Sequence, residues 1–585
     1  MASGPFLLPF HTDPIPSFWS EWWAGALGLA AVVTGLIVIR GRSVVLPRVL
    51  LVPGVLLLTL LVQFGLGRLA FPQIGLLYAA YLLWAGILMI LGRHLFETAG
   101  MFRLADVIAW ALVLGALVGA GIALAQWLSV NIGMGWMLFS KPGGAIYGNL
   151  GQANHHAHYS WLGIASVFYL CGRGMLSRSL LWALILLIGF ASALSGSRSV
   201  FLYPLVIISA IGWSRIRQPR GPAAFLLPYA ALLLPVMVGL SLLGTWATPY
   251  LSELTSRELA AGMAGTRLYD SLSGSSTRLE MARSAWSAFL EMPWLGQGVG
   301  NFRWTSFVAA SSQVGNEPFA VSEHAHNIVL HLLAEFGAVP TGMVVLVLGI
   351  WAKDFLGRSW GLEQFWFATI LGIGAVHSLL EYPLWHAYFL GPAALLLGAA
   401  DSRQIMVLPA RRAAIYLVFV SLVGVSILTS LRKDYGVIES VSYYPLTAHP
   451  DREQAWSISM DRLLKLQRES LLSPWALLAF TILAEPKRQP ANDRAALCVR
   501  GIRLFPARWL VTRCAIQLAI AGRDQDARQL AGAVLRAFPA QRDATLAELA
   551  GGAEQFPEVR RLLAAVRGGE GSSRGASPAT EVFAR

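Results

Sequence analysis

Two histidines and the asparagine after them form the segment whose residue types best suit proton transfer. His324 and His326 are separated by one alanine, Asn327 follows directly, and Glu335 lies farther along the same predicted helix. A neutral imidazole, with an unperturbed pKa of ~6.5, can accept a proton near neutral pH. We predict that His326 is a general base, that His324 can share this role, and that Asn327 orients a loop or a ligand. His-x-His without an acidic or cysteine partner at a defined spacing is weak evidence for zinc, so no metal site is predicted.

Two arginines have surroundings that suit an anionic group. Arg198 follows the turn Ser195-Gly-Ser197 at a predicted helix start, where backbone N–H groups and a guanidinium together favour an oxygen cluster such as a diphosphate. Arg278 begins an amphipathic segment that also carries Glu280 and Arg283. Each arginine has a structural alternative, which is anchoring at a membrane interface for Arg198 and a salt-bridged surface helix for Arg278.

Amide and histidine side chains gather in two further segments. Residues 148–158 read Gly-Asn-Leu-Gly-Gln-Ala-Asn-His-His-Ala-His, and residues 377–383 read His-Ser-Leu-Leu-Glu-Tyr-Pro. Taken one at a time, such side chains often only cap helix ends or satisfy loop backbones. Their joint appearance favours a binding site.

The glycine-rich segment 296–302, Gly-Gln-Gly-Val-Gly-Asn-Phe, superficially resembles a loop that binds nucleotide phosphates. No strand is predicted before it, and the topology described below places it outside the cytoplasm, where nucleotides are scarce. We therefore predict a compact turn and no nucleotide site. The Gly-x-Ser-x-Gly and Cys-His patterns of covalent nucleophiles have no credible match in the sequence.

Composition shows that these segments belong to a membrane protein. Of the 585 residues 56% are hydrophobic and only 13% are charged, whereas a soluble domain carries roughly 25% charged residues. A helix needs roughly 20 apolar residues to cross the hydrocarbon core of a bilayer. About twelve windows satisfy this requirement, which predicts an all-α, polytopic helical bundle. They are 21–39, 44–66, 73–91, 103–127, 157–172, 179–194, 199–213, 222–246, 327–352, 364–381, 385–400 and 413–431.

The short connections that carry Lys and Arg set the predicted orientation. They alternate along the chain, and basic residues are retained on the cytoplasmic side of a membrane. The N-terminus, the long segment 247–326 and all of the polar segments above then face outward. Part of the net charge of +13 comes from these retained basic residues. The sequence has no basic stripe interleaved with aromatics, so a nucleic-acid partner is not predicted. A transporter would hold charged sites near the bilayer midplane, so polar groups at one interface favour an interfacial enzyme.

The last part of the chain has the composition of a soluble domain. Residues 432–585 contain 38 charged residues, compared with 39 in the first 431. Phe505-Pro-Ala507 recurs 33 residues later as Phe538-Pro-Ala540, a spacing typical of tetratricopeptide-type helical pairs. We predict a membrane domain over 1–431, an outer helical-repeat-like domain over 432–567 and a disordered tail over 568–585, with a generic helical cap as the alternative for the second. Cys498 and Cys514 would pair only if adjacent helices bring them together.

Several motifs, in their order along the chain, resemble a known family. The segments 148–158, 197–198, 276–278, 324–327 and 377–383 are similar to those of bacterial protein O-oligosaccharyltransferases of the pilin-glycosylating type. These enzymes belong with O-antigen ligases and polymerases to one superfamily of polytopic, GT-C-like glycosyltransferases. The resemblance covers residues 1 to about 400, and the helical tail also resembles that of the protein-glycosylating branch.

The resemblance implies transfer of a preassembled glycan from undecaprenyl diphosphate to a Ser/Thr hydroxyl of a periplasmic acceptor protein such as a pilin. It implies no cofactor, no metal and no nucleotide sugar, and places the active site at the periplasmic face of the bacterial inner membrane. His326 would take the hydroxyl proton, while Arg198 and Arg278 would bind the diphosphate. The residues assigned to substrate binding are Asn149, Gln152, Asn154, His155, His324, Asn327, His377, Glu381 and Tyr382.

Three other functions stay open at this point. An O-antigen ligase would use the same chemistry on a lipid A-core sugar, and an O-antigen polymerase would use a second lipid-linked glycan as acceptor. A lipid-linked glycan transporter, which is a different class of protein, would need charged residues in a mid-membrane cavity. The helical tail favours a protein acceptor.

Overall fold

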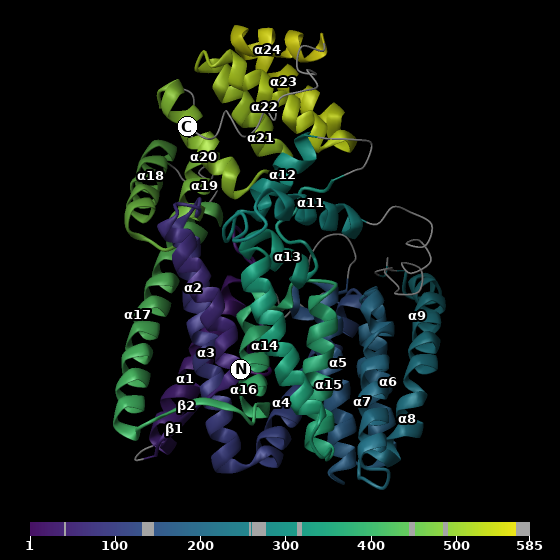
Figure 1. Ribbon diagram of the computed structural model, residues 1–585. Helices are drawn as coiled ribbons and strands as arrows, with labels where there is room; N and C mark the ends of the chain where they lie inside the picture. The colour runs from purple at the N-terminus through teal and green to yellow at the C-terminus, as the bar shows by residue number, and fades with distance from the viewer. Residues whose placement is uncertain are drawn as a thin grey trace. The chain divides into compact units, whose positions relative to one another are not determined.

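The structure, a computed structural model, describes residues 1–39, 42–130, 146–256, 259, 277–312, 319–443, 451–483 and 489–568 (Figure 1). The described residues are almost entirely helical, which confirms the predicted all-α class. The chain divides into two compact units, each built from three separate stretches. Unit 1 contains 1–54, 81–275 and 344–428, and unit 2 contains 55–80, 276–343 and 429–585. The predicted domain boundaries at 431 and 567 stay predictions, and the tail after Gly568 lies outside the described residues.

Long apolar helices make the chain a multi-pass membrane protein. Within the described ranges, seven helical segments are long and apolar enough to cross a bilayer, and shorter apolar helices accompany them. The predicted count of twelve, the inner membrane and the outward orientation stay predictions. Four helices pass from one unit into the other: α2 (Leu51–Gly65), α3 (Pro72–Ala99), α14 (Ala338–Leu356) and α17 (Ala410–Tyr443).

The structure corrects two of the predicted windows. The window 327–352 is not one helix, because Gly337 has φ +83° and separates α13 (Ile328–Phe336) from α14. A Cβ at Gly337 would lie 2.4 Å from the backbone of Trp294, so only glycine allows this approach. The window 44–66 begins with strand β1 (Val44–Pro47), which pairs antiparallel with β2 (Gln404–Leu408).

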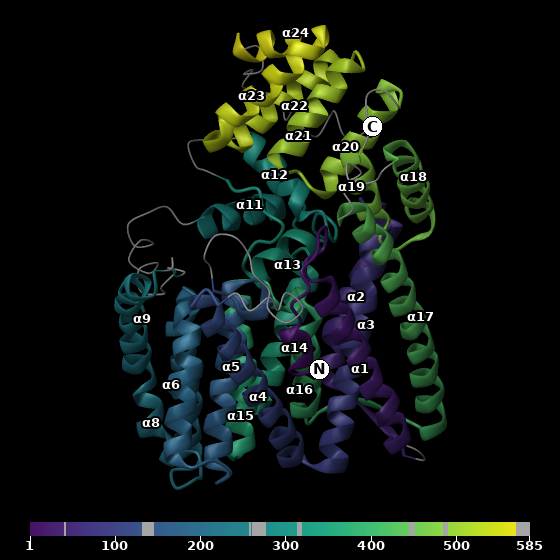
Figure 2. The same ribbon diagram turned by 180° about the vertical axis from the view of Figure 1, so that it is seen from behind.

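Unit 1 is organised around one buried helix, α5. It packs against α4, α6 and α15, as both views of the molecule show (Figures 1 and 2). Small residues permit this close packing, because a Cβ at Gly163 would lie only 2.4 Å from the Ala116 Cβ atom. The Trp366 indole N–H donates to the Ser166 hydroxyl of α5 over 3.0 Å. The α-helices that lie wholly within this unit are α1 (Phe18–Ile39), α4 (Met101–Trp127), α5 (Ala153–Gly172), α6 (Arg178–Leu194), α7 (Tyr203–Arg217), α8 (Leu227–Ala231), α9 (Leu233–Thr255), α15 (Leu362–Ser378) and α16 (Ala387–Ala400).

Unit 2 contains the helical tail together with three helices from the middle of the chain. Three Phe-Pro pairs end tail helices in the same way, because the N–H groups of Phe505, Phe538 and Phe556 each bond the carbonyl four residues earlier and the proline cannot continue that helix. Cys498 and Cys514 are buried free thiols, and burial raises the pKa of the Cys514 thiol well above its usual value. The tetratricopeptide assignment stays a prediction. The helices are α11 (Thr277–Glu291), α12 (Phe302–Ser312), α13, α18 (Arg452–Glu469), α19 (Ser473–Leu483), α20 (Ala491–Leu504), α21 (Arg508–Ile520), α22 (Asp524–Ala537), α23 (Arg542–Gln555) and α24 (Pro557–Arg567).

Candidate functional site

In unit 1, two predicted binding residues converge on a third. Asn154, in the first turn of α5, donates its amide N–H to Glu381 Oε1 over 2.6 Å, and the Gln152 amide donates to Oε2 over 3.4 Å. Glu381 follows the end of α15 and is only 3% exposed. The buried carboxylate therefore links two polar segments that lie more than 200 residues apart in the sequence.

Asn149 holds the N-terminal stretch to the loop before α5. Its side-chain amide donates to the Leu7 carbonyl over 2.8 Å, and its own carbonyl lies 2.5 Å from His11 Nε2. The neighbouring Gly148 both donates to and accepts from the side-chain amide of Gln126. Burial lowers the pKa of His11 below its usual value, although its two backbone contacts oppose this shift.

A cluster of aromatic and imidazole rings surrounds His155 in unit 1. The His155 ring centroid lies 5.7 Å from that of His377, 5.9 Å from that of Tyr382 and 4.9 Å from that of His386. His377 is fully buried, and its Nδ1 atom lies 2.7 Å from the Tyr203 hydroxyl. The structure thus brings the predicted residues His155, His377 and Tyr382 together in one ring cluster.

Two residues next to this cluster were not predicted from the sequence. Glu21 Oε1 lies 2.6 Å from His386 Nδ1, and Oε2 accepts from the Ala387 N–H and from the Tyr81 hydroxyl. Tyr203, at the start of α7, is the second missed residue. Glu21 is the only charged residue of the first predicted span, and an intramembrane carboxylate is a signal that could have identified it.

Arg198 also belongs to unit 1 and lies in the predicted tight turn. Gly196 has φ +71°, and the Ser195 hydroxyl donates to the Ser192 carbonyl and accepts from the Ser197 N–H. Arg198 is half-buried and begins η4 (Arg198–Phe201), a 3-10 turn that leads into α7.

In unit 2, the glycine-rich segment 296–302 encloses a carboxylate of the protein itself. Glu335 Oε1 accepts from the Gly300 N–H over 3.0 Å and from the Phe302 N–H over 3.3 Å. Gln63, on α2, donates to the Glu335 carbonyl and accepts from the Val299 N–H. The loop is therefore a compact turn, as predicted, and its amides serve a buried glutamate.

The segment 324–327 leads into α13 in the same unit. His326 has φ +50°, a left-handed conformation that few residues other than glycine adopt. It is half-buried, whereas His324 and His331 are buried. The Asn327 side-chain oxygen caps α13 by accepting from the N–H groups of Val329 and Leu330.

Arg278 lies in the first turn of α11, which packs against α13. The Ser284 hydroxyl of α11 donates to the Ala320 carbonyl, which ties this helix to the loop before His326. Unit 2 therefore contains both Arg278 and His326, while Arg198 lies in unit 1. Ser276, in front of α11, lies outside the described residues.

In the described ranges, no group of three or more His, Cys, Asp or Glu side chains could hold a metal ion. The groups available for chemistry in these ranges include the half-buried imidazole of His326 and the half-buried guanidinium groups of Arg198 and Arg278. Imidazole can accept a proton, and guanidinium groups bind phosphate oxygens in two-point contacts.

Comparisons with known proteins find two families that match parts of the chain. The family described as O-antigen ligase matches residues 182–347, which include Arg198, Arg278 and His326. The family described as virulence factor membrane-bound polymerase, C-terminal, matches residues 365–549.

Two relatives from Acinetobacter baylyi (strain ATCC 33305 / BD413 / ADP1) extend the similarity along the chain. The chain is 27% identical to its general O-oligosaccharyltransferase over 505 residues, which cover 84% of this chain and 85% of the relative. It is 24% identical to its ComP-specific O-oligosaccharyltransferase over 307 residues, which cover 51% of each chain. These similarities support the assignment of the chain as an oligosaccharyltransferase of the O-antigen ligase superfamily.

Proposed function

We propose that this enzyme transfers a preassembled glycan en bloc from undecaprenyl diphosphate to a Ser/Thr hydroxyl of a protein, at the periplasmic face of the bacterial inner membrane. The names of both relatives support a protein as acceptor, since each is an O-oligosaccharyltransferase and one is described as specific for ComP. The acceptor would be a pilin or another periplasmic protein.

The observation that carries the mechanism is the conformation of His326. A non-glycine residue at φ +50° persists only where its surroundings hold it, and such residues cluster at active sites. The neighbouring imidazoles of His324 and His331 are buried, which leaves His326 as the half-buried imidazole of this segment. His326 acts as the general base, which typically contributes ~10²- to 10⁴-fold to the rate.

The position of α11 supports a lipid-linked donor. Leu279, Trp286 and Leu290 are exposed on one side of this helix, opposite the face that packs on α13. The turn after α11 is anchored to two candidate membrane spans, because the Ala338 N–H at the start of α14 donates to the Pro293 carbonyl over 2.7 Å and Gln63 of α2 donates to the Leu295 carbonyl. An amphipathic helix with exposed Trp and Leu at this level lies in the membrane interface, where a lipid diphosphate is found.

In the reaction, the acceptor hydroxyl loses its proton to His326 and its oxygen attacks the sugar carbon. The bond from that carbon to the diphosphate oxygen breaks, and undecaprenyl diphosphate leaves with both electrons, so the configuration at carbon inverts. Arg198 and Arg278 neutralise the charge that develops on the diphosphate. The glycan or the acceptor is positioned by residues of both sequence units. They are Asn149, Gln152, Asn154, His155, His377, Glu381 and Tyr382 of unit 1 and His324 and Asn327 of unit 2.

The test combines purified protein in lipid nanodiscs with an undecaprenyl-diphosphate-linked disaccharide and candidate acceptors, and measures which acceptor gains mass. We expect a pilin to gain the glycan on Ser or Thr. Gain by lipid A-core alone would make the enzyme an O-antigen ligase, and growth of the lipid-linked glycan would make it a polymerase. Transfer to neither, with movement of the glycan lipid across the bilayer, would indicate a transporter.

The change His326→Ala should abolish transfer in this assay, because it removes the half-buried imidazole that takes the hydroxyl proton, whereas His324 is buried. The rate should fall by roughly 10²-fold or more. Expression and membrane insertion should stay normal, and size-exclusion chromatography of the variant checks this. Transfer near the wild-type rate would remove His326 from the mechanism.

The change Arg278→Lys should also lower transfer, because an ammonium cannot reproduce a two-point guanidinium contact. Loss of one such contact corresponds to roughly 10-fold or more in kcat/KM. Arg283→Lys, one turn and a half farther along α11, is the matched control and should have little effect. Equal rates for the wild type and Arg278→Lys would make Arg278 a surface residue.

A further inference from the structure

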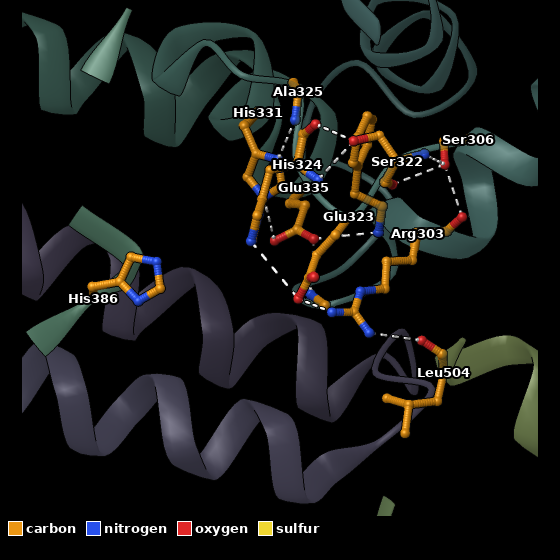
Figure 3. A network of polar contacts seen from close by, with 12 residues as sticks. Arg303, Ser306, Ser322, Glu323, His324, Ala325, His331, Glu335, His386 and Leu504 are labelled. Atoms are coloured by element: carbon orange, nitrogen blue, oxygen red, sulfur yellow. Dashed lines mark hydrogen bonds and ion pairs between the residues drawn. The ribbon is translucent and has the colours of Figure 1, made fainter. Parts of the chain in front are cut away.

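A buried glutamate–histidine pair lies next to His324 and Ala325, the two residues that precede His326 (Figure 3). Both residues are on α13, four residues apart, so their side chains share one face of the helix. Glu335 is 1% exposed and His331 is 2% exposed, and Glu335 Oε2 lies 3.4 Å from His331 Nε2. A carboxylate and an imidazole buried together need a reason in the structure, because removing both from water is costly.

The partner on the other side of the imidazole ring shows which nitrogen carries the proton. The Ala325 N–H donates to His331 Nδ1 over 3.4 Å, so Nδ1 acts as the acceptor. In a neutral imidazole the other nitrogen, Nε2, then carries the proton, and this atom lies 3.4 Å from Glu335 Oε2, at ion-pair distance. The ring therefore connects the Glu335 carboxylate to the backbone of Ala325, the residue between His324 and His326.

Glu335 is itself held from the opposite side. Its Oε1 atom accepts from the N–H groups of Gly300 and Phe302, and its backbone carbonyl accepts from Gln63. Backbone donors cannot rotate away, so the carboxylate is a fixed point in unit 2. On the far side of His326, the Asn327 cap fixes the start of α13. His326 is thus fixed between two restrained neighbours.

A left-handed conformation costs a residue with a side chain roughly 1–2 kcal/mol, and it persists only when the contacts around it determine it. We propose that Glu335 and His331 are positioning residues, which act through the Ala325 amide to hold His326 in this conformation and present its imidazole to the acceptor hydroxyl. The proposal rests on the proposed role of His326 as the base. Neither Glu335 nor His331 touches the reacting atoms.

Replacing His331 with asparagine or with glutamine tests its two contacts separately, because each amide side chain keeps one of them. In His331→Asn, the side-chain oxygen lies where Nδ1 was and can still accept from the Ala325 N–H. In His331→Gln, the side-chain nitrogen lies where Nε2 was and can still donate to Glu335, but the Ala325 N–H loses its acceptor. Both variants lose the ring and one contact, so each is the control for the stability of the other.

The experiment measures two quantities on the full-length protein in nanodiscs. Hydrogen exchange reports protection of the Ala325 and His326 amides without any substrate. Steady-state transfer from the undecaprenyl-diphosphate-linked disaccharide to a pilin reports kcat and the KM for the acceptor. We expect His331→Gln to lose protection at Ala325 and to lower kcat by roughly 10²-fold, because misplacement by about 1 Å costs a factor of this size. His331→Asn should keep both close to wild type, and KM should change little in either variant.

Glu335→Gln provides a second test that keeps the loop bonds. Its side-chain oxygen can still accept from Gly300 and Phe302, while its amide nitrogen donates to His331 Nε2 and so moves the ring proton to Nδ1. The ring can then no longer accept from the Ala325 N–H, so kcat should fall as in His331→Gln. Equal kcat in both His331 variants, or loss of Ala325 protection without loss of kcat, would overturn the proposal. A fully active His326→Ala in the same assay would instead overturn the proposed base, and the exchange data would still report whether the pair holds the loop.

Discussion

Among the residues that the structure describes, each unit buries one glutamate in a polar segment, and the two carboxylates accept hydrogen bonds from different kinds of donor. Glu381 in unit 1 accepts hydrogen bonds from the side-chain amides of Asn154 and Gln152. Glu335 in unit 2 accepts from the backbone N–H groups of Gly300 and Phe302. Both carboxylates are almost completely shielded from solvent, at 3% and 1% exposure.

The difference matters because a side-chain amide can turn and a backbone amide cannot. Asn154 and Gln152 are only partly buried, so they can reach solvent or present their oxygen if Glu381 changes. The amides of Gly300 and Phe302 are fixed by the turn that carries them. The contrast indicates that unit 1 can adjust around its carboxylate, as a binding site must, whereas unit 2 holds a rigid frame.

The largest expected effect is the difference in stability between two variants, Glu335→Ala and Glu381→Ala. Glu335→Ala leaves two backbone donors and His331 without their acceptor in a buried place, which should lower the free energy of unfolding by roughly 3–5 kcal/mol. Glu381→Ala leaves two side-chain amides that can turn, and should cost only about 1–2 kcal/mol. Thermal unfolding of both purified variants checks this order. Equal losses would show that the two sites are equally rigid.

A smaller effect tests why the unit 2 turn contains glycine. Gly298 has φ +102°, and a Cβ there would lie 2.4 Å from the Arg68 carbonyl oxygen, a backbone atom that cannot move aside easily. Gly298→Ala should therefore add a steric clash to the conformational strain and cost about 3 kcal/mol. Gly174 in unit 1 is the matched control, since it has φ +74° and nothing within 4 Å. Gly174→Ala should cost about 1 kcal/mol, and a similar loss in both variants would contradict a tightly packed turn.

Much of the fold was predictable because the signals were local. Hydropathy over about 20 residues identifies an apolar helix without knowledge of its neighbours, and the Phe-Pro pairs at 505 and 538 marked true helix ends. The β1–β2 pair was missed because its partners are distant in sequence: Val44 begins an apolar window, whereas Leu408 lies in the connection between the windows 385–400 and 413–431. The break at Gly337 was missed because the residues around it are apolar on both sides.

The site was predictable as a set of residues but not as a set of contacts. The sequence showed that Gln152, Asn154 and Glu381 were polar residues near membrane ends, yet nothing in it indicated that they bond one another. In the same way, Glu335 lies nine residues after His326, a spacing that predicts no direct contact between the two side chains. The link runs through His331 and the Ala325 backbone, and a backbone N–H has no signature in a sequence.

The smallest expected effect is a change of stability with pH that involves the unit 1 loop and not the unit 2 loop. His11 contacts the Asn149 carbonyl in the unit 1 loop, whereas the unit 2 loop is tied to α2 by Gln63, which does not titrate. Burial lowers the pKa of His11 below its usual ~6.5, so the folded protein keeps this ring neutral. As the pH falls below ~6.5, the unfolded chain binds a proton that the folded chain does not bind. The free energy of unfolding therefore decreases until the pH reaches the lowered pKa of the folded protein.

The change His11→Gln should remove this pH dependence, because glutamine has no proton to bind in this range. The wild type should be the more stable protein at about pH 8, and the difference in thermal midpoint between the two proteins should narrow at about pH 5.5. A matched change in unit 2, Gln63→Glu, would place a titratable carboxyl against the Glu335 and Leu295 carbonyls. It should destabilise the protein more as the pH rises, because an ionised carboxylate cannot donate a hydrogen bond to these carbonyls. Parallel midpoints for wild type and His11→Gln at both pH values would mean that the unit 1 loop, like the turn around Glu335, is held without any contribution from this histidine.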